Sequence, residues 1–373
     1  MKKAIVSVVN DLSTDQRVHK VCTTLHQLGF EVTLIGRRQR SSLPLSSRLY
    51  STKRMFLLFE KGPLFYAFFQ IRLFLYLLVH KADVFVSNDL DTLLPNFLAS
   101  RMKGCELVYD SHELFCEVPE LQNSTMKRNI WKSIERWIFP KLKHVFTVND
   151  SIAKIYSEEY KVKVNVLRNI PLLGNQIRLE AISKEQLGIP SEKKIIVLQG
   201  AGINVDRGAE EAVQAMKFVD DSVLLIIGSG DVISVLKEIT EQENLNDKVK
   251  FLGKVPFEKL LQYTHHADLG LTLDKDTNVN YKYSLPNKLF DYIHAGVPVL
   301  ASPLVEIKNI IMEFNIGQCI ENHDPAHIAA LINSIFQDEE KRSLWKKNTK
   351  IAAGKMNWET EEKVLVEVYS KFL

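Results

Sequence analysis

Tyr283-Ser-Leu-Pro-Asn-Lys-Leu-Phe-Asp-Tyr-Ile-His-Ala-Gly-Val-Pro-Val-Leu-Ala-Ser302 predicts a short helix followed by a buried strand. Pro286 suits the first helical turn, because its missing N–H would have no partner there. Gly296 is expected to end the helix, and the short apolar run after it is typical of a buried strand. The stretch therefore indicates a helix–strand step of an α/β fold.

Lys288 conflicts with this helix. A cation in the first turn opposes the helix dipole, which favours negative charge at that end. A bound anion would remove the conflict, because free backbone N–H groups, the dipole and the ammonium would then all point at it. We therefore expect the start of this helix to hold a phosphate.

Short β-branched runs alternate with helical patterns along the whole chain. Near-continuous apolar strands in such an alternation predict parallel sheets that are covered by helices on both faces. Two series of strands predict two doubly wound α/β domains. The expected strands are 4–9, 31–35, 83–87, 106–109, 145–148 and 164–167 in the first series, and 194–198, 222–227, 249–252, 268–273, 298–301 and 318–320 in the second.

The boundary between the two series is predicted at Arg168–Asn175, where Pro and Gly follow a strand. Residues 1–170 would form the N-terminal domain and residues 171–356 the C-terminal domain. Residues 357–373 begin with a good N-cap, Asn357, and predict an amphipathic helix.

The bulk composition is that of a soluble globular protein. The chain has 373 residues, of which 46% are hydrophobic and 25% charged, so two domains are expected. A net charge of +3 without a long Lys/Arg run gives little support for nucleic acid as a partner. Four separated cysteines without a C-x-x-C pair favour reduced thiols in a cytoplasmic protein. The apolar run at the N-terminus is too short for a signal peptide and predicts a first strand.

A second phosphate candidate lies in the second half of the chain. Arg207-Gly208 follows the strand that ends near Gly200, and opens a helix rich in Ala and Glu. Both candidate loops would lie at the carboxyl ends of parallel strands, where ligands bind in open α/β sheets. We expect Arg207 and Lys288 to share one anion.

Glycines follow two further strands of this domain. Gly228-Ser-Gly230 lacks the third Gly of a dinucleotide fingerprint, which argues against an NAD dehydrogenase. These glycines either only form the turn or let a nucleotide approach the backbone. The same alternatives apply to the loop from Phe251 to Val255.

Asp291 shares a helix face with Lys288. It could accept hydrogen bonds from sugar hydroxyls, or it could be a surface acid paired with Lys288. The ligand role is favoured, because Lys288 already needs an anion in front of it.

Polar side chains also follow strands of the first half. His112 lies just past a strand end, among acids and a serine, and is either a site residue or a satisfied structural histidine. The others could face the same crevice or form ordinary turns. The polar residues of these loops are Asn10, Asp15, Arg17, Asn88, Asp89, Asp110, Ser111 and Glu113.

Two D-x-D spacings occur, Asp89-Leu-Asp91 and Asp274-Lys-Asp276. Such a pair could hold a metal ion beside a phosphate. The spacing is common by chance, and paired cations already neutralise charge, so we expect no metal.

The stretch 63–79 is strongly apolar and aromatic, and basic residues lie within it and around it. It falls short of the usual spanning length and contains Gln70 and Arg72. Two interpretations stay open: a helix buried against the first sheet, or a contact with a membrane surface.

These motifs together resemble the family 4 retaining glycosyltransferases of GT-B fold, over nearly the whole chain. The residues that carry the resemblance are Asp15-Gln-Arg-Val18, Tyr109-Asp-Ser-His-Glu113, Thr147-Val-Asn-Asp-Ser151, Arg168-Asn-Ile-Pro171, Gln199-Gly, Arg207-Gly, Gly228-Ser-Gly, Phe251-Leu-Gly-Lys-Val-Pro, Ser284-Leu-Pro-Asn-Lys-Leu-Phe-Asp-Tyr292 and Ala295-Gly-Val-Pro-Val299.

The resemblance implies two Rossmann-like domains that face a cleft, with the donor on the C-terminal domain and the acceptor mainly on the N-terminal domain. The last helix would cross back to the N-terminal domain. The catalytic residues would be His112, Arg207, Lys288 and Asp291, and the acceptor side would include Asn10, Asp15, Arg17, Asn88, Asp89 and Glu113. The donor-binding residues would be Gly200, Arg207, Gly228, Gly230, Val255, Tyr283, Ser284, Leu285, Pro286, Asn287, Lys288 and Asp291.

The implied reaction is metal-independent transfer of a sugar, with retention, from a UDP- or GDP-linked donor to an acceptor hydroxyl. No cofactor is expected. The acceptor would be a glycan or a lipid-linked glycan in cell-surface polysaccharide or glycoconjugate assembly. The protein would be cytoplasmic, or peripheral on the inner face of the membrane.

Two alternatives stay open. A nucleotide-sugar 2-epimerase shares the architecture but would need acid/base carboxylates at the sugar. A non-catalytic donor-binding subunit is supported by Tyr283, which stands where the family usually has the first Glu of its motif.

Overall fold

The computed structural model describes residues 1–373 except 14, 41, 43, 123 and 174–182. Two compact units divide the chain, residues 1–169 with 361–373 and residues 170–360. Gly174 and Asn175, in the predicted boundary, lie outside the described residues.

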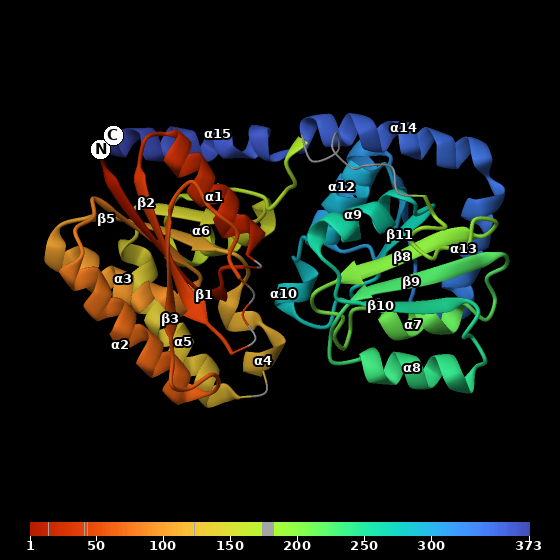
Figure 1. Cartoon of the computed structure of the whole chain (residues 1–373), viewed down its shortest axis with the longest axis horizontal. Helices are drawn as coiled ribbons and strands as arrows, with labels where there is room; N and C mark the ends of the chain where they lie inside the picture. The colour runs from red at the N-terminus through yellow and green to blue at the C-terminus, as the bar shows by residue number, and fades with distance from the viewer. Residues whose placement is uncertain (14, 41, 43, 123, 174–182) are drawn as a thin grey trace. The chain divides into compact units, whose positions relative to one another are not determined.

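The N-terminal unit contains a seven-stranded parallel sheet in the order β3-β2-β1-β4-β5-β6-β7 (Figure 1). β1 lies between β2 and β4, with Ala4 opposite Val32 on one side and Val84 on the other. Its strands are β1 (Lys3–Asp11), β2 (Glu31–Arg38), β3 (Ser51–Phe56), β4 (Val84–Asn88), β5 (Glu106–Ser111), β6 (His144–Thr147) and β7 (Val164–Val166).

Helices cover both faces of this sheet. The α-helices of the unit are α1 (Gln16–Gln27), α2 (Pro63–Val79), α3 (Leu90–Lys103), α4 (Pro119–Gln122), α5 (Thr125–Ile138), α6 (Asp150–Tyr160) and most of α15 (Trp358–Tyr369), and the 3₁₀ turns are Phe115–Glu117, Phe139–Lys141 and Ser370–Phe372.

The C-terminal unit contains a six-stranded parallel sheet in the order β10-β9-β8-β11-β12-β13. Its strands are β8 (Lys194–Gly200), β9 (Ser222–Gly228), β10 (Val249–Gly253), β11 (Leu269–Thr272), β12 (Val299–Ala301) and β13 (Gly317–Cys319). Its helices are α7 (Ala209–Ala215), α8 (Ile233–Gln242), α9 (Phe257–His265), α10 (Val279–Lys282), α11 (Asn287–Ala295), α12 (Val305–Phe314), α13 (Pro325–Gln337) and α14 (Glu339–Lys355).

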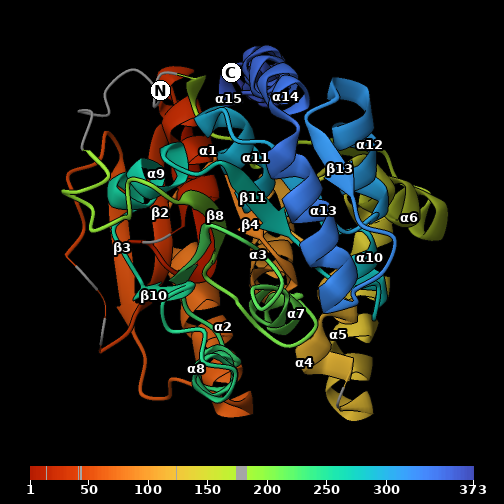
Figure 2. The same cartoon turned by 90° about the vertical axis from the view of Figure 1, so that its right-hand side faces the viewer.

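Helices cover the two faces of the C-terminal sheet (Figures 1 and 2), and an apolar core lies on each face. Val197 and its strand neighbours pack against α9, α11, α12 and α14. Ile196, with the opposite orientation, packs with α7, α8 and α13. Alternate residues of one strand therefore enter different cores, which explains why the strands are apolar throughout. Both predicted sheets and their parallel character are confirmed.

β3 was not predicted from the sequence. Five of its six residues are polar or exposed, and only Met55 is buried. An edge strand of this kind has no apolar run to mark it.

Residues from the far end of the chain complete the N-terminal unit. Asn357 caps α15, because its side-chain oxygen accepts from the Thr360 N–H at 2.9 Å. Tyr369 is buried, and its ring lies 6.1 Å from the Phe30 ring and 6.4 Å from the Phe146 ring. This segment is therefore part of the core of that unit.

The apolar stretch 63–79 forms the single helix α2, which has one buried and one exposed face. Phe69 and Leu73 are fully buried, whereas Ile71 and Leu75 are exposed. None of the described helices is long and apolar enough to cross a membrane.

Gly228 occupies a position that admits no side chain. Its φ is +135°, and a Cβ would lie 1.8 Å from the carbonyl oxygen of Gly200 on the neighbouring strand. We expect Gly228→Ala to destabilise the protein by roughly 3 kcal/mol, through backbone strain and overpacking. Urea unfolding followed by circular dichroism measures this.

Gly354 is the matched control, because a Cβ there meets no atom within 4 Å and the residue lies in α14. Gly354→Ala should leave stability unchanged or raise it by about 0.5–1 kcal/mol. Equal effects of the two substitutions would refute the packing argument.

Candidate active site

Two cations of the C-terminal unit share one buried carboxylate. Asp274 follows β11 and has no exposed surface. Its Oδ1 accepts from Arg207 Nη1 at 2.8 Å, and its Oδ2 lies 3.2 Å from Lys288 Nζ. The Thr272 hydroxyl donates to the same Oδ2 at 3.1 Å. Arg207 and Lys288, which are 81 positions apart in the sequence, are thus held beside one another.

The pairing favours the charged forms of Asp274 and Arg207. Burial opposes ionisation of Asp274, but Lys288 and Arg207 outweigh it and lower the pKa of that carboxyl. Burial also disfavours the Arg207 cation, yet Asp274 raises its pKa. The Tyr281 ring lies 4.0 Å from the Arg207 guanidinium carbon, an additional cation–π contact. One aspartate faces two cations, so the cluster carries net positive charge.

Lys288 is the second residue of α11, and Pro286 is its N-cap. The anion that faces this lysine in the structure is the Asp274 carboxylate. From the sequence, Asp274 was interpreted only as part of a D-x-D metal spacing. Its position just after a strand, in a domain with two cations at helix starts, is the signal that could have identified it as the anion between those cations.

Asp291 lies one turn further along α11 and is 9% exposed. Its Oδ2 accepts from Gln199 Nε2 at 3.0 Å, and the Thr264 hydroxyl donates to Gln199 Oε1 at 2.6 Å. The interpretation of Asp291 as a surface acid is therefore wrong, because the side chain is buried against β8.

The segment before α11 carries most of the other predicted donor residues. Tyr283, Ser284, Leu285 and Pro286 are half-buried, and Asn287 is exposed. Ser284 Oγ is buried and has no hydrogen-bond partner among the described residues. A buried hydroxyl without a protein partner can form a hydrogen bond with a bound ligand.

Gly228 and Gly230 are explained by packing of the protein on itself. A Cβ on Gly230 would lie 1.9 Å from the Ile203 carbonyl oxygen, and Gly228 meets Gly200 in the same way. Gly200 is different, because a Cβ there would meet only Gly202 N at 3.9 Å. Val255 packs at the edge of the core that contains α9 and α11.

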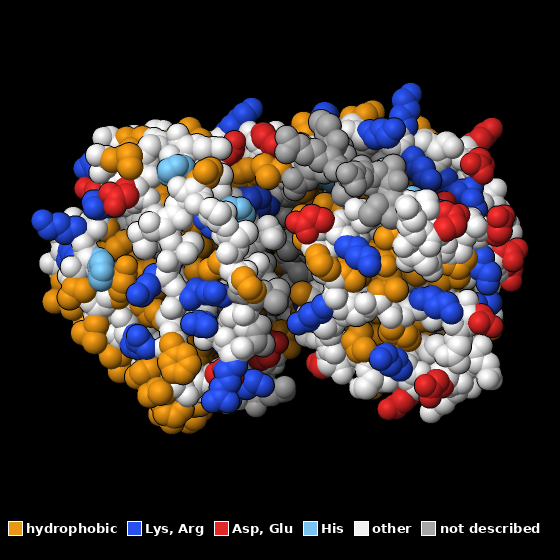
Figure 3. Space-filling view, in the orientation of Figure 1, with side chains coloured by type: hydrophobic (Ala, Val, Ile, Leu, Met, Phe, Trp, Pro, Cys, Tyr) orange, Lys and Arg blue, Asp and Glu red, His pale blue; other side chains and the backbone are white. Residues whose placement is uncertain are grey.

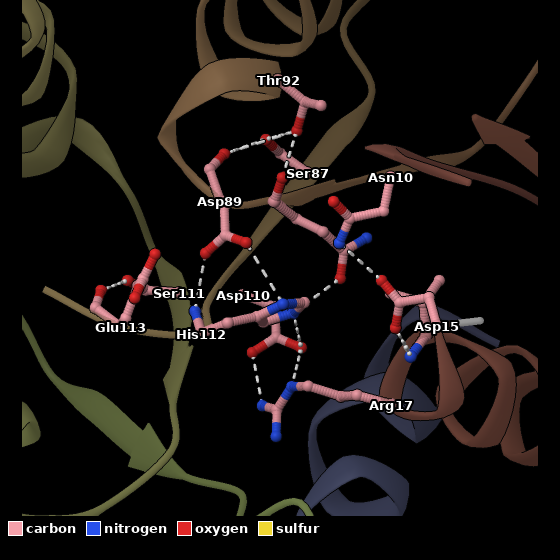
Figure 4. Close-up of polar contacts among 12 residues, drawn as sticks. Asn10, Asp15, Arg17, Ser87, Asp89, Thr92, Asp110, Ser111, His112 and Glu113 are labelled. Atoms are coloured by element: carbon pink, nitrogen blue, oxygen red, sulfur yellow. Dashed lines mark hydrogen bonds and ion pairs between the residues drawn. The ribbon is translucent and has the colours of Figure 1, made fainter. Parts of the chain in front are cut away.

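A second ion cluster lies at the carboxyl edge of the N-terminal sheet (Figure 4). Arg17, in the first turn of α1, donates to both carboxylate oxygens of Asp110 at 3.0 and 2.6 Å. Its remaining nitrogen donates to the Leu167 carbonyl at 2.7 Å. Both side chains are buried. Burial opposes ionisation of Asp110, but Arg17 and His112 lower its pKa below the usual range.

His112 lies between two carboxylates. Its Nδ1 is 3.2 Å from Asp89 Oδ2, and its Nε2 is 3.5 Å from Asp110 Oδ2 and 3.2 Å from Asn88 Oδ1. Burial lowers the basicity of the imidazole, but Asp89 and Asp110 outweigh it and raise the pKa to about 9. The raised pKa favours the imidazolium form of His112 at neutral pH, a form that donates hydrogen bonds and has no free nitrogen to accept a proton.

Asp89 is held in a strained backbone conformation. Its φ of 58° and ψ of 169° fall in a region that is otherwise reserved for glycine. The carboxylate uses this position to accept from the His112 backbone N–H at 2.8 Å as well as from the ring. Strain of this kind is found where the surrounding structure fixes a functional group.

The other predicted residues of this unit lie around the cluster (Figure 4). Asn10 Nδ2 donates to Asp15 Oδ2 at 3.0 Å, and Asp15 caps α1 by accepting from the Val18 N–H. Asn88 Nδ2 donates to the Ser7 carbonyl at 3.0 Å. The backbone carbonyl of Glu113 accepts from the Ser111 hydroxyl at 2.8 Å.

The two carboxylates of each D-x-D spacing have different surroundings. Asp89 pairs with His112, whereas Asp91 Oδ1 is buried without a partner among the described residues. Asp274 holds the two cations, whereas Asp276 lies 3.4 Å from Lys282. Outside the uncertain positions, no three His, Cys, Asp or Glu side chains group as metal ligands.

Comparison with known proteins identifies the family. Residues 180–352 match Glycosyl transferases group 1, and residues 15–171 match Glycosyltransferase Family 4. The two matches occupy complementary parts of the chain. The chain therefore belongs to the group 1, family 4-like glycosyltransferases.

One curated relative is a D-inositol 3-phosphate glycosyltransferase of Xylanimonas cellulosilytica, 20% identical over 198 residues that make up 50% of this chain and 45% of the relative. The chain spans less than half the length of the curated relatives it matches.

Solved structures show the same GT-B fold. Sucrose-phosphate synthase of Thermosynechococcus elongatus has a TM-score of 0.81 at 16% identity, over 100% of this chain and 99% of that one. The Alr3699/HepE protein of Anabaena, in complex with UDP-glucose, has a TM-score of 0.73 at 13% identity, over 100% of both chains.

The charge of His112 predicts a specific pH dependence of stability. Its pKa is about 9 in the folded protein and near 6.5 when unfolded, so its stabilising contribution is complete below pH 6.5 and is lost as the pH rises to about 9. The loss is on the order of 3 kcal/mol.

His112→Asn should flatten this part of the stability–pH curve, as measured by urea unfolding between pH 6 and 10. His26→Asn replaces a half-buried histidine of α1 and is the control. This variant should retain the slope of stability against pH. A wild-type-like curve for His112→Asn would contradict the assignment.

Removal of the Asp274 charge should leave two largely buried cations side by side. We expect Asp274→Asn to lower the free energy of unfolding by roughly 3 kcal/mol. Asp276→Asn, a change of the same kind two residues away at an exposed ion pair, should cost less than about 0.5 kcal/mol. Chemical denaturation of both variants tests this, and equal losses would rule out a special role for Asp274.

Proposed function

We propose that the protein transfers a sugar from a nucleoside-diphosphate sugar to an acceptor hydroxyl. The donor would be UDP- or GDP-linked, and the reaction would proceed with retention and without a metal ion or cofactor. The observation that carries the proposal is the Arg207–Asp274–Lys288 cluster of the C-terminal unit. Family membership and the UDP-glucose bound to the similar Anabaena protein support it.

The cluster has the charge that a diphosphate needs. Arg207 is pre-oriented by Asp274 and Tyr281, and Lys288 points from the first turn of α11, where N–H groups also favour an anion. Departure of the nucleoside diphosphate builds up negative charge on its oxygens. Fixed cations stabilise that charge with little reorganisation, which is the main way in which such a site would accelerate the reaction.

Two further groups support donor binding near α11. Ser284 Oγ is buried without a partner among the described residues, so a ligand oxygen there would satisfy it. Asp291, oriented by Gln199, is the acceptor that we assign to the nucleotide ribose hydroxyls. Tyr283 stands where the family usually has an acid at the donor sugar, so the sugar identity is left open.

We assign acceptor binding to the N-terminal unit. His112, as an imidazolium fixed by Asp89 and Asp110, can donate a hydrogen bond or attract negative charge, and its role is to position donor or acceptor. The acceptor would be a glycan or a lipid-linked glycan in surface polysaccharide or glycoconjugate assembly. The place of action would be the cytoplasm or the inner face of the membrane.

Substitution of either cation tests the phosphate assignment. Lys288→Ala and Arg207→Ala should each lower kcat/KM for the donor by about a hundredfold or more, because each removes a charge that meets the leaving group. Lys282→Ala is the control, since this lysine pairs with Asp276 at the surface and should be neutral. Unchanged donor affinity and rate in both site variants would refute the proposal.

A donor screen identifies the reaction most directly. The full chain would be incubated with a panel of UDP- and GDP-sugars, with and without EDTA, and free nucleoside diphosphate would be measured. Release with one donor supports transfer, and sensitivity to EDTA contradicts metal independence. A new sugar nucleotide of inverted configuration at C2 would instead identify an epimerase.

A further inference from the structure

One face of α2 is apolar and exposed. Leu64 (62%), Ile71 (59%), Leu75 (56%) and Val79 (76%) repeat at helical spacing and lie opposite the buried residues Phe65, Phe69, Leu73 and Leu77. An ordinary surface helix has charged side chains on its outer face. This helix has a single charged residue, Arg72.

The connection between β3 and α2 extends this surface. Phe56, Leu58 and Phe59 are exposed, and the Phe59 ring lies 6.3 Å from the Phe68 ring on α2. Arg72 donates to the Phe56 carbonyl, which joins the two segments. We call these exposed residues of α2 and of the connection the α2 face. Figure 3 shows hydrophobic side chains gathered over α2. Contiguous apolar patches of this kind mark surfaces that bind a partner.

Cations outnumber acids around the α2 face. Within 51–81, which is described throughout, Glu60 is the one acid, whereas Lys53, Lys61, Arg72 and Lys81 are exposed cations. The helices that pack beside α2 continue the pattern. α3 and α5 contain one acid each, the half-buried Asp91 and the buried Glu135, and both helices carry exposed cations, Arg101 on α3 and Lys127 and Arg136 on α5.

We propose that the α2 face lies on an anionic phospholipid surface. Apolar side chains would enter the boundary between head groups and acyl chains, and the surrounding cations would meet lipid phosphates. A second copy of this chain is disfavoured as the occupant, because it would bring like-charged rims together.

The connections of α2 to the sheet show where the α2 face begins and ends. β3 leads into α2 at the carboxyl edge of the N-terminal sheet, the edge that also carries His112. The Arg37 guanidinium carbon, at the end of β2, lies 5.1 Å from the ring centre of Phe65 in the first turns of α2. The α2 face begins at this edge and continues to Val79, shortly before β4, so a bound protein would lie with the length of α2 along the lipid surface. The inference does not depend on the proposed function.

Vesicle sedimentation tests the proposal. The purified full chain would be mixed with vesicles of phosphatidylcholine alone, or of phosphatidylcholine with phosphatidylglycerol, at low and at high salt. We expect binding to the anionic vesicles that is at least tenfold stronger than to the neutral ones and that weakens at high salt. Equal binding to both, or no binding to either, would overturn the proposal.

Matched variants locate the contact. Ile71→Asp with Leu75→Asp should reduce binding to anionic vesicles at least tenfold. Val235→Asp with Met312→Asp changes two exposed apolar residues of the C-terminal unit and should bind like the wild type. Thermal unfolding confirms that both variants fold, and the wild-type comparison of vesicle types needs no variant. Full binding by the α2 variant would overturn the proposal.

Light scattering completes the test. If the wild type is a dimer and the α2 variant a monomer, a second copy occupies the α2 face and the proposal is wrong. Donor binding in solution is measured separately, so failure of membrane binding leaves the proposed function standing.

Discussion

The Asp274 carboxylate is the constraint on which the C-terminal cluster depends. Two cations at the starts of helices would repel each other and oppose the helix dipoles, and both effects would open the loops that carry them. A buried carboxylate between them reverses the balance and fixes their separation. A ligand then meets a site whose charge is already in position, so little of its binding energy is spent on ordering the protein.

In the N-terminal unit, too, a buried carboxylate pairs with a cation in the first turn of a helix. Arg17 begins α1 as Lys288 begins α11, and its anion is Asp110 at the end of β5. There, however, the carboxylate also faces His112, and Asp89 adds a second negative charge. The result is an imidazole whose pKa is raised, which favours its charged form. This state depends on three side chains that come from strand ends, and on the strained backbone of Asp89.

Much of this arrangement follows from local sequence, and the rest from pairings across the sheets. Apolar runs predicted twelve strands, because the inner strands of both sheets are buried on both faces, and β3 was missed since an exposed edge strand has no such run. Helix-start cations at Arg207 and Lys288 predicted an anion, but not that Asp274 supplies one within the protein. Partners that are 67 or 93 residues apart cannot be found from spacing. Gly228 and Gly230 could have been needed for the turn or for approach of a nucleotide. The structure explains them by packing, because a Cβ on Gly228 would meet Gly200 and a Cβ on Gly230 would meet Ile203.

Residues 361–373 belong to the unit that is made first on the ribosome. Glu361 accepts from the Arg168 backbone N–H at 2.8 Å, Glu362 accepts from the Thr24 hydroxyl at 2.7 Å, and Tyr369 fills the space beside Phe30. None of these contacts can form until all of residues 170–360 have been translated. The N-terminal unit therefore emerges first but is completed last, and during synthesis the apolar surface under Tyr369 is open to chaperones or to misassembly.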